Sequence, residues 1–441
     1  MIQFIIRTAQ EVDLGILPRH WQLALRLLLL VIFVLSGCAK KPPQLTLLNI
    51  PITDSAFQSS LAAFTGAPVI GGNTVDILLN GDETFPALVE ALRSAQKTIT
   101  FEAFIFHKGK VGDLIVETLA DRCQAQVYVA ILLDAHGASD LPKEYVNRLR
   151  NAGCHIVPDF RPLSVWRFGR LEMRDHRRIV VIDGRIGFTG GYGVDDAWIG
   201  DGRTKDRWRE TNVRLQGPVV QHLQAAFMEH WREATHALLG GEEFFPYRPL
   251  PVSEAPVQVQ VVWSSPIRDN FSLYDVFLQS IYSAQRSILI STPYLFPDEQ
   301  LTEALLQAIQ RGVVVRVLIP SVVEGTGVEY VTQESHRERF GPLLDGGVQL
   351  NEYSPALLHT KMMIVDKVWA TIGSTNVDNR SMGINDELNV VFYDEKIAKR
   401  LEDIFQEDLT HSRKISRDQL HNRGWFGRAL GTLTSPFHDH F

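Results

Sequence analysis

The chain has 441 residues, more than one hydrophobic core usually organises, so we expect two domains or two fused halves. Hydrophobic residues make up 45% and charged residues 22% of it, a globular composition without low-complexity tracts. The net charge of −7 disfavours a surface that tracks nucleic-acid phosphates, although a local basic groove would still be compatible with it.

Residues 1–37 are typical of a cleaved export signal. The apolar run LLLLVIFVLSGC starts at Leu27 and is too short to span a bilayer comfortably. Its end resembles the bacterial lipoprotein signal, in which cleavage leaves the cysteine, here Cys38, as an acylated N-terminus. With Ala39 next, this resemblance implies a lipid-anchored protein on the periplasmic side of the bacterial cell envelope, at the outer rather than the inner membrane. The alternative is a chance SGC after an ordinary anchor helix.

Two further cysteines, Cys123 and Cys154, each precede a predicted strand, VYVAILLD and HIVPDF. Adjacent parallel strands would bring both cysteines to the same sheet edge, and an exported compartment permits a disulfide. The sequence is equally compatible with a disulfide between Cys123 and Cys154 and with two buried free thiols.

The chain repeats itself in order. Residues 88–106 match residues 276–296, with the triplet SAQ before an apolar strand in both copies. A helical stretch and then a buried-strand run follow each copy. This alternation predicts two fused, pseudo-twofold related α/β units with mixed, largely parallel sheets flanked by helices.

Four prolines within residues 246–256 predict a linker, because proline at this density breaks both helix and sheet. We therefore place the halves at residues 39–245 and 257–441. Pseudo-twofold packing would bring both copies of any motif to a shared cleft. Since one chain supplies both copies, a monomer would suffice.

The strongest motif occurs twice, as HRRIVVIDGRIGFTGGYG from His176 and as HTKMMIVDKVWATIGSTN from His359. Residues two apart on a strand face the same way. Each histidine should therefore project together with its cation, Arg178 in the first copy and Lys361 in the second.

The remaining motif positions have different expected roles. Asp183 and Asp366 are an odd number of residues from the motif histidines, so their side chains should point to the other face of the strand. We therefore expect them to be structural, each pairing with a buried group near the strand's end. The turns that follow, GG at Gly190 and Gly191 and TIGSTN in the second copy, place small residues and backbone amides where phosphate oxygens could bind.

Two histidines with two cations suit phosphodiester cleavage. One neutral imidazole attacks phosphorus, the other donates a proton to the leaving oxygen, and the cations stabilise the developing charge. Glu210 and Glu387, equivalent in the two halves, are the candidates to orient the imidazoles. No metal or cofactor is required, and the terminal HDHF is interpreted as a tail.

The whole pattern resembles the phospholipase D superfamily, over about residues 71–412, and within it the bacterial cardiolipin synthases. The resemblance implies transfer of a phosphatidyl group from phosphatidylglycerol to a second phospholipid alcohol through a phosphatidyl-histidine. The second copy matches the family signature fully, at His359, Lys361, Ser374, Asn376 and Glu387.

The first copy matches at His176, the nucleophile that the family's tendency implies, and at Glu210. It departs from the signature with Arg178 in place of Lys and Gly193 in place of Asn. Losing one preorganised donor can cost on the order of 3 kcal/mol. Tyr192 or Asn212 could supply a replacement donor. The alternative interpretation is that Tyr192 is a core residue and Asn212 an edge-strand residue.

Three function classes remain open: a phosphatidyltransferase, a hydrolase of the same fold (phospholipase or nuclease), and a lipid-binding protein of faded activity. The expected partners are a phospholipid membrane and anionic phospholipids, with no nucleic acid. Arginines and aromatics in residues 160–174, and the aromatic C-terminal segment 425–437, suit such a surface. Motifs do not identify the acceptor, whether lipid alcohol or water.

Overall fold

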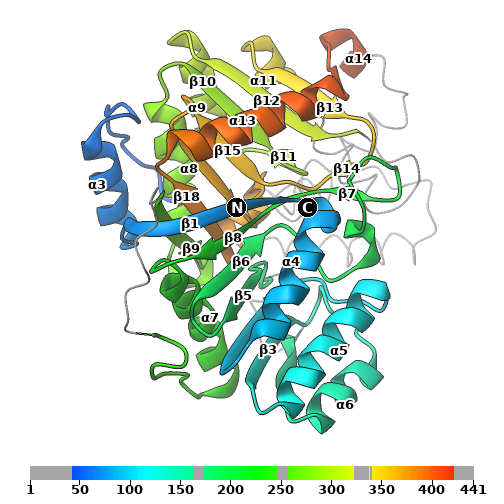
Figure 1. Cartoon of the computed structure of the whole chain (residues 1–441). Coiled ribbons are helices and arrows are strands. Elements are labelled where there is room, and N and C mark those ends of the chain that lie inside the picture. The colour runs from blue at the N-terminus through cyan, green and yellow to red at the C-terminus, as the bar shows by residue number, and fades with distance from the viewer. Residues whose placement is uncertain (1–41, 163–172, 247–256, 322–336, 338–339, 422–441) are drawn as a thin grey trace, which may run out of the picture.

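One sheet runs through both halves of the molecule. The computed structural model describes residues 42–162, 173–246, 257–321, 337 and 340–421. In the first half the strands follow the order β4-β3-β2-β5-β6-β8-β1, and in the second the order β13-β12-β10-β15-β16-β18-β9. The two central strands, β1 and β9, pair with each other (Figure 1). The duplication predicted from the sequence is thus present as a pseudo-twofold strand order.

The strands of the first half are β1 (Ile70–Leu79), β2 (Thr98–Ala103), β3 (Tyr128–Asp134), β4 (His155–Phe160), β5 (Ile179–Ile182), β6 (Ile186–Gly190) and β8 (Thr211–Gln216). Those of the second half are β9 (Val257–Ser264), β10 (Ser287–Ser291), β12 (Val314–Pro320), β13 (Gln349–Tyr353), β15 (Met362–Val365), β16 (Trp369–Gly373) and β18 (Glu387–Phe392), with β19 (Ser412–Lys414) at the edge. Two short pairs lie apart, β11 (Leu295–Phe296) with β17 (Val377–Asp378), and β14 (Leu357–Leu358) with β7 (Trp208–Arg209).

The sheet is mixed, as expected, but the expectation that it is largely parallel is wrong. Within this large sheet, parallel pairing is confined to β2-β3-β4 and β10-β12-β13, where helices connect the strands. Toward the centre the strands pair antiparallel. The turns at residues 183–185 and 366–368 account for one such pair in each half, β5-β6 and β15-β16, since a connection of this length permits only a hairpin.

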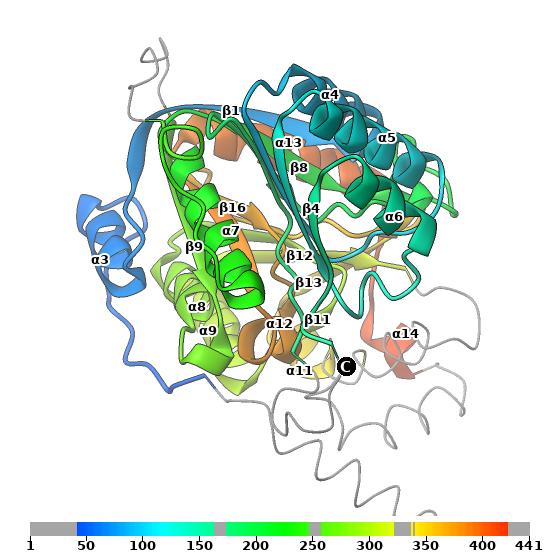
Figure 2. The ribbon, with the colours of Figure 1, turned by 90° about the horizontal axis from the view of Figure 1, so that it is seen from below.

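Helices cover both faces of the sheet in each half. In the first half, α4 (Asn80–Ser94) and α5 (Lys110–Gln124) pack on one face of the sheet and α7 (Val220–Thr235) on the other. Helix α6 (Lys143–Asn151) lies beside α5 and contacts the edge strand β4. In the second half, α8 (Ser272–Ser283) and α9 (Glu299–Gln310) take the place of α4 and α5, and α13 (Glu395–Thr410) that of α7 (Figures 1 and 2). Apolar strand residues are buried on both sides, which accounts for their continuous hydrophobic runs.

Short elements complete the described chain. Helix α3 (Ser55–Thr65) precedes β1 yet packs on α8 of the second half through Phe57 and Leu61. The others are the 3-10 helices η1 (Asp196–Trp198) and η2 (Pro266–Arg268) and the helices α11 (Phe340–Asp345), α12 (Asn379–Gly383) and α14 (Arg417–His421). Of the helices described, none has the length and apolarity of a bilayer span.

Several sequence predictions lie outside the described residues. These are the export signal, Cys38, residues 247–256 of the linker, most of the arginine-rich segment 160–174, and the aromatic segment 425–437. They stay predictions.

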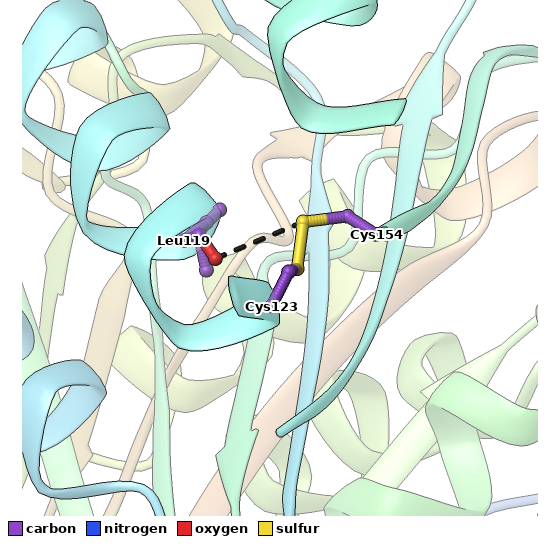
Figure 3. Close-up of a disulfide and its surroundings, with 3 residues drawn as sticks. All are labelled: Leu119, Cys123 and Cys154. Atoms are coloured by element: carbon purple, nitrogen blue, oxygen red, sulfur yellow. Dashed lines mark hydrogen bonds between the residues drawn. A yellow bond between two sulfur atoms is a disulfide. The ribbon is translucent and has the colours of Figure 1, made fainter. Parts of the chain in front are cut away.

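The pair Cys123 and Cys154 forms a disulfide (Figure 3). Cys123 lies in the last turn of α5, ahead of β3, and Cys154 lies just before β4, so both are at the starting end of the parallel pair β3-β4, as expected. The bridge thus joins the helix to the outermost strand of the first half.

We expect the Cys123→Ser/Cys154→Ser double variant to lose about 3–4 kcal/mol of unfolding free energy, because the bond closes a loop with a sequence separation of 31. Urea unfolding of the variant against the oxidised wild type measures the difference. Reductant should shift the wild-type midpoint toward the variant's and leave the variant's own midpoint in place. A variant as stable as the wild type would contradict the prediction.

Candidate active site

Both motif histidines lie where the two halves meet. The backbone N–H of His176 donates to the carbonyl of Asp386 (2.9 Å), and that of His359 donates to the carbonyl of Arg209 (2.8 Å). Strand β5 begins only at Ile179 and β15 only at Met362, so each histidine and its cation precede the strand on which the sequence placed them. The reason is that their backbone pairs with the opposite half instead of with the sheet.

The two glutamates are exchanged between the halves. His176 Nδ1 lies 2.9 Å from both carboxylate oxygens of Glu387, and His359 Nδ1 lies 2.6 Å from Oε2 of Glu210. All four side chains are buried. Each imidazole is therefore oriented by a carboxylate from the other half, and neither half holds a complete site alone. We call the surroundings of His359 the Glu210 pocket and those of His176 the Glu387 pocket.

The free ring nitrogen of each histidine faces its own cation. Arg178 Nη2 lies 3.1 Å from His176 Nε2, and Lys361 Nζ lies 2.9 Å from His359 Nε2. Both cations are buried, and Lys361 also donates to the carbonyl of His359 at 2.6 Å. Two nucleophilic nitrogens and two cations thus border one site, the arrangement that suits an anionic phosphodiester.

The site favours neutral imidazoles. Burial lowers the pKa of His176 and of His359 well below the usual value, and the charges of Arg178 and Lys361 lower both further. The same two cations act on both rings because the motif copies converge. An unprotonated Nε2 is what attack on phosphorus requires.

Burial also shifts the pKa values of the groups around the imidazoles. It raises the pKa of Glu210 to about 7 and that of Glu387 to about 8, and it lowers the pKa of Lys361 to about 7. Shifts of this kind in a buried polar cluster are typical of catalytic sites. A bound phosphodiester anion would favour the charged form of Lys361.

From these pKa values we expect a bell-shaped pH dependence of kcat/KM. The acid limb belongs to the two carboxyl groups, because Glu387 becomes protonated below about pH 8 and Glu210 below about pH 7, and neither then accepts from its histidine. The alkaline limb belongs to Lys361, which loses its charge above about pH 7. Arginine stays charged at any such pH, so Lys361→Arg should lower the rate but move the alkaline limb to higher pH and leave the acid limb in place. An alkaline limb that stays where it is in the variant would assign it to another group.

The turns after the motifs differ between the two halves. In the second, the Ser374 hydroxyl donates to Glu387 and accepts from the N–H of Leu388 (3.0 Å). Asn376 is buried, and its Oδ1 has no hydrogen-bond partner within the described part of the chain, so it remains open to a ligand.

In the first half the backbone amides of the turn already donate to a side chain of the protein, that of Asn212. The N–H of Gly191 donates to Asn212 Oδ1 (3.1 Å), which also accepts from Tyr192 N–H (3.3 Å), while Asn212 Nδ2 donates to Thr84. Asn212 is therefore structural. The hydroxyl of Tyr192 is buried without a hydrogen-bond partner among the described residues. A Cβ at Gly190 would lie 2.2 Å from Asn212 Oδ1, so only glycine fits there.

The motif aspartates fold the chain at the opposite end of the strands. Asp183 accepts from the backbone N–H groups of residues 96–98, and Asp366 from those of residues 285–287, at 2.7–2.9 Å. Each set runs from the last residue of an SAQ triplet to the first residue of the next strand, so each aspartate ties its hairpin turn to the start of the neighbouring strand. Neither contacts the histidines.

A buried ion cluster lies directly behind the site and joins the halves. His230 of α7 has Nδ1 2.6 Å from Glu102 and 3.3 Å from Asp175, and Nε2 2.7 Å from Asp386 of the second half. Arg161 also reaches Asp386, at 2.6 Å. Asp175 and Asp386 directly precede His176 and Glu387 in the chain, so the cluster holds both sides of that pair in place.

Glu102, Asp175 and His230 lie close enough together to bind a metal ion. However, both ring nitrogens of His230 face carboxylates, so the ring is an imidazolium and offers no lone pair to a metal. Burial and Arg177 lower the pKa of His230, but the carboxylates of Asp175 and Glu102 outweigh them and raise it to about 10. We therefore interpret the cluster as an ion-pair network.

Sequence reasoning missed Trp198, whose indole N–H donates to Glu210 Oε2 at 3.3 Å. It also missed His230 and Asp386. For Trp198 the sequence does carry a signal. When the two motif copies are aligned position by position, a tryptophan in the first copy stands opposite Ser381 in the second.

Comparison with known proteins agrees with this geometry. The family described as "Cardiolipin synthase, PLD-like domain" matches residues 88–231 and 277–409, one copy in each half. The chain belongs to this family. Each of the two matched segments contains one histidine motif, and the structure brings the two motifs together where the halves meet.

Its curated relatives match most of its length. The chain is 35% identical over 366 residues to the probable cardiolipin synthase YwiE of Bacillus subtilis, covering 83% of this chain and 72% of that protein. It is 35% identical over 378 residues to cardiolipin synthase A of Pseudomonas syringae, covering 84% and 76%. The structure of phosphatidylserine synthase from Haemophilus influenzae superposes with a TM-score of 0.63 at 13% identity, covering 86% of this chain and 96% of that one, which shows a common fold.

Proposed function

We propose that this member of the cardiolipin synthase family is a phosphatidyltransferase, which moves a phosphatidyl group from phosphatidylglycerol to the hydroxyl of a second phospholipid. The observation that carries the proposal is the crossed pairing His176–Glu387 and His359–Glu210, which forms one site with two oriented imidazoles. The curated cardiolipin synthases that match over most of the chain support the choice of substrate class.

The first step forms a covalent intermediate. Nε2 of His176 attacks phosphorus, and the bond from phosphorus to the glycerol headgroup oxygen breaks. His359 takes up a proton at Nε2 when the phosphodiester anion binds and gives it to that oxygen, so that glycerol leaves. Glu387 holds the Nδ1 proton of His176 and stabilises the positive charge that develops on the ring. Arg178 and Lys361, beside the two Nε2 atoms, stabilise the phosphate oxygens.

The second step reverses the first with a new alcohol. His359 takes the proton from the hydroxyl of a second lipid, the oxygen attacks phosphorus, and the bond from phosphorus to His176 breaks. With phosphatidylglycerol as both donor and acceptor, two molecules give cardiolipin and glycerol. Water in place of the lipid alcohol gives phosphatidic acid.

We further propose that the mature chain is anchored through an acylated Cys38 at the periplasmic face of the outer membrane and acts there on anionic phospholipids as a monomer. The disulfide Cys123–Cys154 supports an oxidising compartment. Lipid attachment would keep the site at the bilayer surface where both substrates are found.

The test follows the products when the purified mature chain meets phosphatidylglycerol vesicles. Cardiolipin with an equal amount of glycerol supports transfer, whereas phosphatidic acid alone would make the chain a hydrolase. Absence of turnover in the wild type, with intact binding to the vesicles, would replace the proposal with lipid binding. Replacing Cys38 by Ser should release the protein from the membrane fraction, and a variant that stays there would overturn the anchor.

A further inference from the structure

The two pockets are built differently, and the differences occur together. At the motif positions of Ser374, Asn376 and Ser381, the first half carries Gly191, Gly193 and Trp198. The Glu387 pocket thus has a hydroxyl on its carboxylate, whereas the Glu210 pocket has an indole.

The indole of Trp198 explains the glycine at position 193, and the carboxylate that it binds explains the glycine at position 191. A Cβ at Gly193 would lie 2.8 Å from Cζ3 and 2.9 Å from Cη2 of Trp198, so the indole occupies the space that an asparagine would need. A Cβ at Gly191 would lie 2.6 Å from Glu210 Oε2, so no serine can reach that carboxylate from there. The donor comes from Trp198 instead, and it reaches Oε2, the same oxygen that holds His359.

The indole is held firmly and forms part of a wall beside the imidazole. Asp195 accepts from Ala197 N–H at 2.7 Å and thereby caps η1, the turn that carries Trp198, and His107 Nδ1 lies 2.9 Å from the same carboxylate. The ring centroids of Trp198 and Trp208 lie 5.3 and 4.8 Å from that of His359. The imidazole that would handle the proton of the acceptor therefore lies against two indoles.

We propose that Trp198 is a positioning and specificity-determining residue, whose N–H fixes Glu210 on His359 and whose ring shields this imidazole from water, so that a lipid alcohol is activated in preference to water. The inference rests on the proposed function, because it assigns to His359 the proton of the acceptor. Gly193 is then no sign of a decayed site, since the glycine is what makes room for the indole. An apolar wall disfavours a loosely held water at the attacking position.

The first experiment compares Trp198→Phe with the wild type and with Trp231→Phe. Phenylalanine keeps most of the ring but removes the N–H, and Trp231 is a matched control because its Nε1 is buried without a partner among the described residues. We expect Trp198→Phe to lower kcat by about 10- to 100-fold, the effect of losing a hydrogen bond to a charged group. Its acid limb of kcat/KM should also move to higher pH, since the indole N–H lowers the pKa of Glu210. Trp231→Phe should leave both unchanged.

The second experiment exchanges the two pocket designs. Gly193→Asn alone should lose most of the activity, because the new side chain meets the indole, and Gly193→Asn/Trp198→Ser should recover part of it by copying Asn376 and Ser381. The double variant should give more phosphatidic acid per cardiolipin than the wild type, because the wall is gone. Circular dichroism of each variant separates loss of activity from loss of fold.

Two results would overturn the inference. One is an unshifted acid limb in Trp198→Phe, and the other is a Gly193→Asn variant as active as the wild type. Failure of the proposed function is seen separately, as a wild type that makes phosphatidic acid alone. In that event the acid limb, measured on hydrolysis, still decides whether Trp198 positions Glu210.

Discussion

Replacing His176 by Ala is expected to abolish transfer, lowering kcat by about 10⁴-fold or more, because it removes the nitrogen to which the phosphatidyl group would be bonded. His359→Ala is expected to cost about 10²- to 10⁴-fold, the usual contribution of a general acid and base. The measurement is single-turnover release of glycerol from labelled phosphatidylglycerol.

The same pair of variants assigns the two roles. With His359 absent, His176 can still accept the phosphatidyl group slowly, so His359→Ala should retain protein-bound lipid label after denaturation without acid, and His176→Ala should retain none. Label bound in His176→Ala and absent in His359→Ala would exchange the roles of the two histidines. As a control, His222→Ala alters a histidine on α7 outside the site and should turn over like the wild type.

Removing the charge of Asp386 is expected to have the largest effect on stability. Its carboxylate is fully buried and holds both His230 and Arg161 across the two halves. Breaking a buried pair on one side leaves uncompensated charge inside the protein, which costs about 3–5 kcal/mol. Asp386→Ala should lose about this much in urea unfolding. It should also lose activity, because the side chain holds in place the backbone carbonyl of residue 386, which accepts from the N–H of His176.

The control is a second ion pair between the halves, Arg203–Glu407, whose side chains are 50% and 57% exposed. Glu407→Gln should change the unfolding free energy by less than about 1 kcal/mol, as exposed pairs do. Equal losses in the two variants would show that burial is not what makes Asp386 important.

The same cluster predicts the pH dependence of stability. The pKa of His230 is raised from 6.5 to about 10 in the folded protein, so its contribution is fully present below pH 6.5 and is lost as the pH rises through about 10. For Asp386, Arg161 and His230 outweigh the effect of burial and lower the pKa, so its contribution is present above its unfolded pKa and is lost toward low pH. The unfolding midpoint of the wild type should therefore fall on both sides of neutrality, and His230→Gln should flatten the alkaline side.

Local patterns identified what the parts are. The two motif copies, the repeated SAQ triplets and the alternating apolar runs predicted a duplicated α/β protein, both histidines, both cations and both glutamates. These features are readable because strand periodicity and motif spacing act over a few residues. The turn at residues 183–185 carried the same local information, and neglecting it led to the wrong expectation of a largely parallel sheet.

The fold class, the duplication and the chemical groups of the site could therefore be predicted from the sequence. Which of these groups contact each other could not, because that depends on the folded chain. His176 and Glu387 are 211 positions apart, and His359 and Glu210 are 149 apart, so their pairing depends on how two finished halves dock. The same docking brings Asp386 between His230 and Arg161. Packing inside the first half places the indole N–H of Trp198 next to Glu210, to which it donates. Such contacts follow from the shapes and charges of packed surfaces, which no spacing along the chain encodes.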